Sequence, residues 1–420
     1  MLKRNYMVYV MFIMMAGFLF PVPAASGQST DQHANTGFPD VPSTHWAYEA
    51  IQTGVERGYI KGFPDGTFRP NDPVTAAQFI KMAFMSLTDD SRGFVFWSEK
   101  YLNMVPDWRR ARLVQDTANF EDGTPWYKNY IETAKNNAFI HDEFDGRFDE
   151  PITREQAAKF ISKLDTIFRG HHVREYSMLA GAQLFKDFDQ VDFYLQEYVG
   201  DVALRGIMIG NNGYFNPKGK ITRAEAAKIC LLLMDDSKRA KVNVNLEGVP
   251  YSIVPIQGYG TMVMIFANEE MKKIYDEMYR RQKDYPGATY ADGGSLAYFE
   301  NEQLRDETVR AFYSWDINNW KIRRDFGLSF SGNAYSMGVA TEEGRLERAR
   351  GEIRHFLSLI FEKEADSVYR LIESVVLKAR QGVNETIEKT VEGRQILIVS
   401  HGDVLNIGIS AFQDKQGGED

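Results

Sequence analysis

Two arginines stand where the sequence predicts the start of a helix. Arg154 lies in Thr153–Gln156 and Arg223 lies in Thr222–Glu225, and in both segments Gln or Glu follows the threonine by three residues. This is the spacing of a capping box, which closes the first turn of a helix. Each arginine then occupies the first helical position, beside unpaired N–H groups and the positive end of the helix dipole, where it can complement an anion. The alternative is that both are solvated first-turn residues.

The motif occurs a third time along the chain. Val74–Gln78 has the same spacing, but Ala76 takes the place of the arginine. The capping threonines of the three copies are 78 and 69 residues apart, so the period is irregular. Recurrence of one helix-start motif indicates an internal repeat, and it favours the anion-binding interpretation of the arginines.

Each copy carries elements that would position the motif. In the first copy, Trp46, Ile51 and Val55 follow helical spacing, and Gly58 is placed to end that helix. The turn Asp65–Phe68 then leads to a second helix. Two short helices cannot bury their apolar faces alone, so the copies are expected to pack together. A linear solenoid and a pseudo-threefold bundle are both compatible with the spacing.

The repeated pattern resembles the S-layer homology (SLH) module, a family that anchors exported bacterial proteins to the cell wall. Its most specific segments are Gly62–Pro70 and Ile221–Glu225, and the resemblance covers residues 38–236, about half of the chain. It implies an N-terminal all-α pseudo-trimer. The implied modules are residues 38–87, 120–168 and 185–236, with an inter-module insert at 88–119.

The resemblance also implies a ligand, a secondary cell wall polysaccharide that often ends in a pyruvylated sugar. Arginine can hold such a carboxylate with two hydrogen bonds. By matching positions, the implied polysaccharide-binding residues are Arg154 and Arg223 for the anion, Asp40, Asp122 and Asp187 for hydroxyl or amide groups, and Trp46 and Trp126 for the groove walls. The aspartates have the alternative role of capping helices, and the tryptophans that of core residues.

Departures from the family pattern limit this expectation. Ala76 replaces a basic residue, and Tyr194 replaces a tryptophan. Ala138 and Asp142 stand where the first copy has glycine. We therefore expect fewer than three working grooves, with Arg154 and Arg223 carrying most of the binding.

The first residues have the order of a secretory signal peptide. Lys3 and Arg4 precede the apolar run Tyr6–Phe20 and a stretch of small residues, which predicts cleavage after about residue 25 and a disordered leader at 26–37. Removing residues 1–25 changes the formal charge from −9 to −11. Such a chain is not expected to bind nucleic acid, and no other apolar run is long enough to span a membrane. The expected location is the cell wall or cell surface of a bacterium.

Residues 242–420 differ in character and predict a mixed α+β domain, so the overall class is α+β. The lone cysteine, Cys230, precedes this region in an apolar helix and is expected to be buried. Strands are predicted at 242–246, 251–254, 261–266, 393–399 and 404–412, and the first two are expected to pair as a hairpin. Helices are predicted at 268–283, 301–314 and 342–380, the last of which is either one long helix or a broken pair.

The function of this second half is predicted to be assembly or interaction, with other surface-layer proteins as further candidate partners. No metal spacing, nucleophile elbow or phosphate loop is found, so no catalytic residue, metal or cofactor is assigned. Ser400–Asp403 is either a catalytic loop or a turn between antiparallel strands. The alternative function is a wall-anchored hydrolase with its active site in residues 242–420. Convergence of His401, Asp403, Glu300 and Glu302 in one cleft would favour it.

Overall fold

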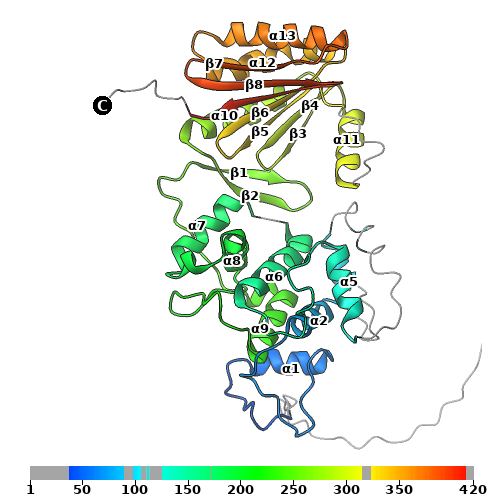
Figure 1. Ribbon diagram of the computed structural model, residues 1–420, viewed down its shortest axis with the longest axis vertical. Helices are drawn as coiled ribbons and strands as arrows, with labels where there is room; N and C mark the ends of the chain where they lie inside the picture. The colour runs from blue at the N-terminus through cyan, green and yellow to red at the C-terminus, as the bar shows by residue number, and fades with distance from the viewer. Residues whose placement is uncertain are drawn as a thin grey trace, which may run out of the picture. The chain divides into compact units, whose positions relative to one another are not determined.

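The computed structural model of the chain describes residues 37–88, 97, 99–105, 110, 113, 125–170, 172–314 and 323–412. The predicted signal peptide, the leader up to residue 36 and most of the insert at 88–119 lie outside this part. The described residues up to 240 form helices and turns, called here the helical half, and those from 251 form strands and helices, called the sheet half (Figure 1). The predicted α+β class is confirmed.

The capping boxes predicted in the three copies are all present and open the second helix of each copy. In each, the threonine hydroxyl accepts the N–H of the Gln or Glu, whose side chain accepts the N–H of the threonine. The helices of this half are α1 (Tyr48–Glu56), α2 (Ala76–Ser86), α3 (Glu99–Leu102), α5 (Lys128–Asn136), α6 (Arg154–Arg169), α7 (Arg174–Leu184), α8 (Gln196–Leu204) and α9 (Arg223–Met234), with short 3-10 turns at Phe188–Gln190, Phe193–Leu195 and Asp236–Lys238.

The segments that precede α2, α6 and α9 hydrogen-bond to one another in a closed ring. The N–H of Val74 donates to the carbonyl of Ile221 (2.9 Å), the N–H of Ile221 to that of Ile152 (3.1 Å), and the N–H of Ile152 to that of Val74 (3.1 Å). All three side chains are buried in one apolar core. Each copy therefore contacts both of the others, whereas in a linear stack contacts join neighbouring repeats only.

The sheet half contains a hairpin, a larger sheet and helices. Strand β1 (Tyr251–Ile256) pairs with β2 (Gly260–Ile265), and all pairs of the larger sheet are antiparallel. The order in the larger sheet is β3 (Ala288–Asp292), β4 (Ser295–Phe299), β5 (Phe326–Ser331), β6 (Ala334–Ala340), β9 (Val404–Ser410), β8 (Arg394–His401) and β7 (Thr386–Val391). The helices are α10 (Glu269–Arg281), α11 (Glu302–Ser314), α12 (Arg345–Ile360) and α13 (Ala365–Arg380), with a 3-10 turn at Gln282–Asp284.

The larger sheet has one face buried in a large apolar core, and on its other face the middle strands β5 and β6 carry small and polar residues. Phe326 and Leu328 of β5 are buried in a second core with residues of α10, α12 and α13. Figure 1 shows α12 and α13 along one side of the sheet. Successive side chains of a strand point to opposite faces, so Gly327 and Ser329 belong to the face turned away from these helices. This face is called the open face below.

One strand prediction was wrong. Residues 242–246 form no strand, and β1 pairs with β2 instead. The side chain of Gln183 in α7 takes the place of a partner strand, because its Oε1 accepts the N–H of Asn245 (2.9 Å) and its Nε2 donates to the Asn245 carbonyl (2.9 Å). The turn interpretation of Ser400–Asp403 is confirmed, since this segment joins the antiparallel strands β8 and β9.

Candidate functional site

The first N–H groups of the three second helices are not free for an external anion, which corrects one expectation. The N–H of Arg154 donates to the carbonyl of Gly219 (2.9 Å), and the N–H of Arg223 donates to that of Asp72 (2.9 Å). The N–H of Ala76 is used in the same way by Glu150 (3.0 Å). Closure of the ring brings a loop of another copy over each helix start, so these N–H groups already have acceptors within the protein.

The Arg154 side chain crosses from the second copy to the third. Its Nε donates to the Phe215 carbonyl (2.7 Å), and its Nη1 forms an ion pair with Glu225 Oε1 (2.6 Å). The guanidinium lies over the Phe215 ring, 5.3 Å from the centroid, and the side chain is 14% exposed. The charge of Arg154 is therefore neutralised by the protein itself.

The Arg223 side chain makes the corresponding crossing from the third copy to the first, without a carboxylate partner. Its Nε donates to the Phe68 carbonyl (2.8 Å) and its Nη2 to the Lys61 carbonyl (2.9 Å). The guanidinium lies over Phe68 and Phe63, 4.5 and 4.9 Å from the ring centroids. Burial lowers the pKa of Arg223, and the charges of Asp72 and Asp40, which form no ion pair with it, oppose this only in part; a guanidinium stays protonated in proteins. Among the described residues, no ion pair compensates this charge.

The difference between the two junctions follows from one position of the capping box. The Phe215 carbonyl accepts the Nε–H of Arg154, and the Phe68 carbonyl accepts that of Arg223 in the equivalent way. The third copy, which contacts Arg154, has Glu225 at the third position of its second helix. The first copy, which contacts Arg223, has Gln78 at that position. A glutamine closes the capping box but carries no charge. The remaining junction, where α2 opens with Ala76, has no arginine at this position. Among the described residues, one of the three junctions thus carries an arginine without an ion-pair partner.

The aspartates bind backbone groups inside the protein. Asp40 accepts the N–H groups of Phe68 (2.9 Å) and Arg69 (2.6 Å), and Asp187 accepts those of Phe215 (2.8 Å) and Asn216 (2.7 Å). Burial opposes ionisation of Asp40, but these two N–H groups bring its pKa below the ordinary value. The carboxylates thereby fix the loops whose phenylalanine carbonyls hold the arginines, and α1 has no side-chain cap. Asp122 lies outside the described residues.

Both candidate tryptophans lie at the surface rather than in the core. Trp46 is 60% exposed and Trp126 is 50% exposed. Trp126 of the second copy faces the first, because the Lys81 ammonium of α2 is 5.1 Å from its ring centroid. Trp46 precedes α1, which packs against α9 of the third copy. Both rings are therefore available to stack on a sugar.

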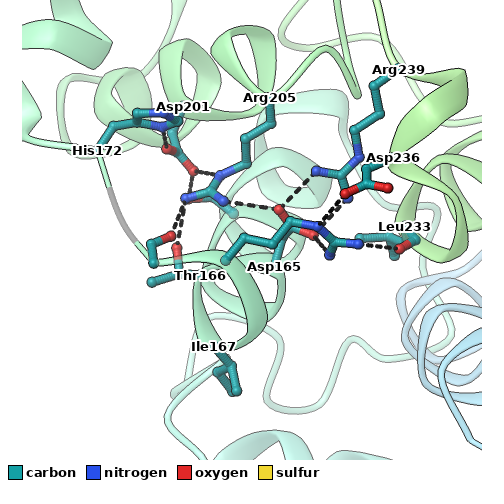
Figure 2. A network of polar contacts seen from close by, with 12 residues as sticks. Asp165, Thr166, Ile167, His172, Asp201, Arg205, Leu233, Asp236 and Arg239 are labelled. Atoms are coloured by element: carbon teal, nitrogen blue, oxygen red, sulfur yellow. Dashed lines mark hydrogen bonds and ion pairs between the residues drawn. The ribbon is translucent and has the colours of Figure 1, made fainter. Parts of the chain in front are cut away.

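A buried polar network joins the ends of α6 and α8 to the segment after α9 (Figure 2). The fully buried Asp165 carboxylate accepts Arg169 Nη1 (2.6 Å), Arg205 Nη1 (2.9 Å) and Arg239 Nη2 (2.7 Å). The chain of contacts continues from Arg205 to Asp201 (2.6 Å). Burial alone would raise the pKa of Asp165, but its arginine partners lower that pKa by a larger amount, so the net shift is downward. These charges pair with one another, and the network holds the elements that carry the junctions.

The four polar residues considered for a hydrolase are not brought together. His401 and Asp403 are exposed at the turn between β8 and β9. Glu300, which follows β4, pairs with Arg348 (3.1 Å), and Glu302 is exposed at the start of α11, 3.8 Å from Arg305. Strands β4 and β9 are separated by two strands, about 14 Å at ordinary spacing. Within the described ranges, no cluster of three or more His, Cys, Asp or Glu could hold a metal, and no helix is long and apolar enough to cross a membrane.

Some groups at the junctions were missed from the sequence. The Phe68 and Phe215 carbonyls and rings receive the arginines, and Glu225 neutralises Arg154. The difference between Gln and Glu at this capping-box position can be read from the sequence. Its effect on an arginine of another copy can be recognised only when the closed ring is known. No sequence signal identified which copy each arginine would meet.

Comparison with known proteins supports the family suggested by the motifs. The family model described as S-layer homology domain matches residues 37–80 and 184–227, within the first and third copies. An S-layer protein of Bacillus licheniformis is 28% identical over 229 residues, which are 54% of this chain and 22% of that protein. S-layer protein EA1 of Bacillus anthracis is 28% identical over 231 residues, again 54% of this chain and 22% of the relative.

An enzyme also shares this likeness. An endoglucanase of Bacillus sp. strain KSM-635 is 28% identical over 217 residues, 51% of this chain and 20% of that protein. The chain thus spans about a fifth of the length of these curated relatives. What they share with it is confined to about half of the chain.

Proposed function

Because this chain is an SLH-domain protein of the cell surface or cell wall, we propose that its three copies form a pseudo-trimer that binds an acidic secondary cell wall polysaccharide. The closed ring of Val74, Ile152 and Ile221 supports the pseudo-threefold arrangement. SLH domains bind cell wall polysaccharide in general, and a carboxylate such as that of a pyruvylated sugar is the chemistry that suits an arginine.

The observation that carries this proposal is the Arg223 guanidinium at the junction of the third and first copies. It is held in place by two backbone carbonyls and two aromatic rings, and no described carboxylate forms an ion pair with it. An anionic sugar group would supply the missing charge. Trp46, exposed before α1 at the same junction, would stack on the sugar ring.

Arg154 and the aspartates have other roles in this proposal. Arg154 already holds Glu225 and contributes less to anion binding. Asp40 acts as a positioning residue, because it fixes the loop whose Phe68 carbonyl holds Arg223. Asp187 has the equivalent role for the loop of Phe215.

The sheet half is proposed to serve assembly or interaction, with other surface-layer proteins as candidate partners. A wall-anchored hydrolase is the weaker alternative. It has the support of the endoglucanase among the relatives, but His401, Asp403 and Glu300 do not gather in one cleft.

Sedimentation of the full chain with purified cell walls tests the anchoring role. We expect the chain to sediment with intact walls and to stay in solution once the secondary polysaccharide has been removed. The double variant Arg154→Ala/Arg223→Ala should stay in solution with both preparations. Arg57→Ala, which removes an exposed charge from the same half, is the matched control and should bind as the unaltered chain does. Full binding by the folded double variant would overturn the proposal.

A further inference from the structure

Arg324 of the sheet half lies flat on the open face. Gly327 of β5 and Gly338 of β6 are direct partners across the two strands. A methyl group added at Gly327 would lie 2.8 Å from Arg324 Nη1, and one added at Gly338 would lie 2.7 Å from Nη2. Only the absence of a side chain at these two positions allows the guanidinium to rest on the sheet.

This guanidinium has no partner among the described residues. No hydrogen-bond acceptor and no carboxylate is found for it, and its Nε is buried and unpaired. Burial lowers the pKa of Arg324, with no charged neighbour contributing. An arginine stays protonated in proteins, and a buried charge without a counter-ion is costly.

Other buried charges of the same half are compensated. Arg394 is 2% exposed and forms two 2.7 Å contacts with Glu270. Asp325, next to Arg324 in the chain, is fully buried and binds Arg348 Nε (2.8 Å) and the Tyr285 hydroxyl (2.7 Å). Among the described residues, the half-buried Arg324 is therefore an exception.

A hollow of about 300 Å³ surrounds Arg324 on the open face. The hollow exists because small side chains line it, and several of the lining groups can donate hydrogen bonds. Its lining includes Ser295, Ser329, Ser336, Asn406 and Gly408. A cation, several hydroxyls and an amide around one hollow are the groups that bind an oxyanion.

We propose that the open face of the sheet is a second anion-binding site, in which Arg324 holds a carboxylate or phosphate group. The serine hydroxyls and the Asn406 amide bind the remaining oxygens or neighbouring hydroxyls of the ligand. This site is independent of the junctions between the copies. It gives the sheet half a binding role that does not require catalysis.

The test uses the full chain carrying Arg154→Ala and Arg223→Ala, so that the junctions do not contribute. Its thermal unfolding midpoint is measured at constant ionic strength with inorganic phosphate, sodium glucuronate or glucose. Phosphate or glucuronate should raise the midpoint, and the probe that acts shows which oxyanion is bound. Glucose should have no effect. Equal stabilisation by glucose, or no stabilisation by either anion, would overturn the proposal.

Glycine substitutions identify the group responsible. Gly338→Ala displaces the Arg324 guanidinium, whereas Gly351→Ala adds a methyl group to the exposed side of α12, outside the hollow, with nothing within 4 Å of it. Added to the same background, Gly338→Ala and Arg324→Gln should each weaken anion binding by about tenfold or more, as expected for loss of a charge-assisted contact. Gly351→Ala should keep the response to phosphate. A Gly338→Ala chain that responds as fully as Gly351→Ala would contradict the assignment to Arg324.

Discussion

Arg154 of α6 and Glu225 of α9 form a 2.6 Å ion pair across two copies of the repeat. Glu225 also accepts the N–H of Thr222 (2.9 Å) and so closes the capping box of its own helix. One side chain thus fixes a helix start and cancels the charge of a neighbouring copy. In the first copy the same position is Gln78, and among the described residues Arg223 has no ion-pair partner.

The two arginines are therefore expected to differ in importance. Arg223→Ala should weaken wall binding by about 10- to 100-fold, the loss typical of one hydrogen-bonded charge. Arg154→Ala should weaken it by less than about threefold. Dissociation constants of both variants for purified wall polysaccharide test this, and equal losses would contradict it.

Replacing Glu225 by glutamine should create a second active junction. Glutamine closes the capping boxes of α2 and α6, so Glu225→Gln should preserve the helix start while it leaves Arg154 without a counter-ion. We expect wall polysaccharide to bind up to about tenfold more tightly. The thermal midpoint checks that the variant is folded, and weaker binding by a folded variant would argue against a role for junction charge.

The helical half could be predicted from sequence further than the sheet half. Three capping boxes gave the starts of α2, α6 and α9 because this motif depends on residues only three positions apart. The location of Arg223 against Phe68 could not be predicted, since the two residues are 155 positions apart in the sequence and meet only through closure of the ring. The helix-start N–H groups were expected to be free, and the same closure occupies them.

The sheet half shows the limit of local patterns. Helices α10 and α11 and the pair α12 and α13 agree with the predicted ranges, as do β8 and β9. The strands β3, β4, β5, β6 and β7 were missed. In β5 and β6, Gly327, Ser329 and Gly338 interrupt the apolar residues and weaken strand propensity. The same residues lie on the open face. The small side chains that weaken the strand pattern are therefore also the ones that leave room for Arg324.

Ala138 offers a test of local strain. It follows α5 with φ +56°, where α1 and α8 are followed by Gly58 (φ +77°) and Gly206 (φ +68°). A left-handed conformation costs a non-glycine residue about 1–2 kcal/mol. Glycine avoids this cost, but part of the gain is lost because glycine gives up more conformational entropy on folding. Ala138→Gly should therefore raise the free energy of unfolding by roughly 0.5–1 kcal/mol.

The reverse change provides the control. Gly58→Ala adds a methyl group that meets nothing within 4 Å, so its effect is conformational. It should lower the free energy of unfolding by about 1 kcal/mol. Denaturant unfolding of both variants checks the pair, and destabilisation by Ala138→Gly would contradict the account.

The network of Figure 2 should matter for stability. Asp165→Asn leaves three arginines around an uncharged side chain and should cost about 3–5 kcal/mol of unfolding free energy. Asp236→Asn removes a carboxylate that is 64% exposed and 3.6 Å from Arg169, and it should change the stability by less than about 1 kcal/mol. Similar losses from both would mean that burial of the network contributes little.

The same carboxylate predicts a pH dependence. Because the folded-state pKa of Asp165 is lowered, its contribution is complete above the ordinary carboxyl value of about 3.9 and is lost as the pH falls through the lower folded-state pKa. The difference in unfolding free energy between the unaltered chain and Asp165→Asn should stay constant from neutral pH to about pH 5 and shrink below about pH 4. A difference that remains unchanged in acid would contradict this.

The uncompensated charge of Arg223 is tested most directly by Gln78→Glu. Glutamate closes the capping box of α9, so the helix start should be kept while a carboxylate is placed beside Arg223. The measurement is the dissociation constant of the full chain for purified acidic wall polysaccharide, compared with the unaltered chain and with Gln156→Glu at the junction without an arginine. The account predicts a loss of about tenfold for Gln78→Glu and less than about twofold for Gln156→Glu. Unchanged binding by folded Gln78→Glu, or an equal loss in both variants, would contradict it.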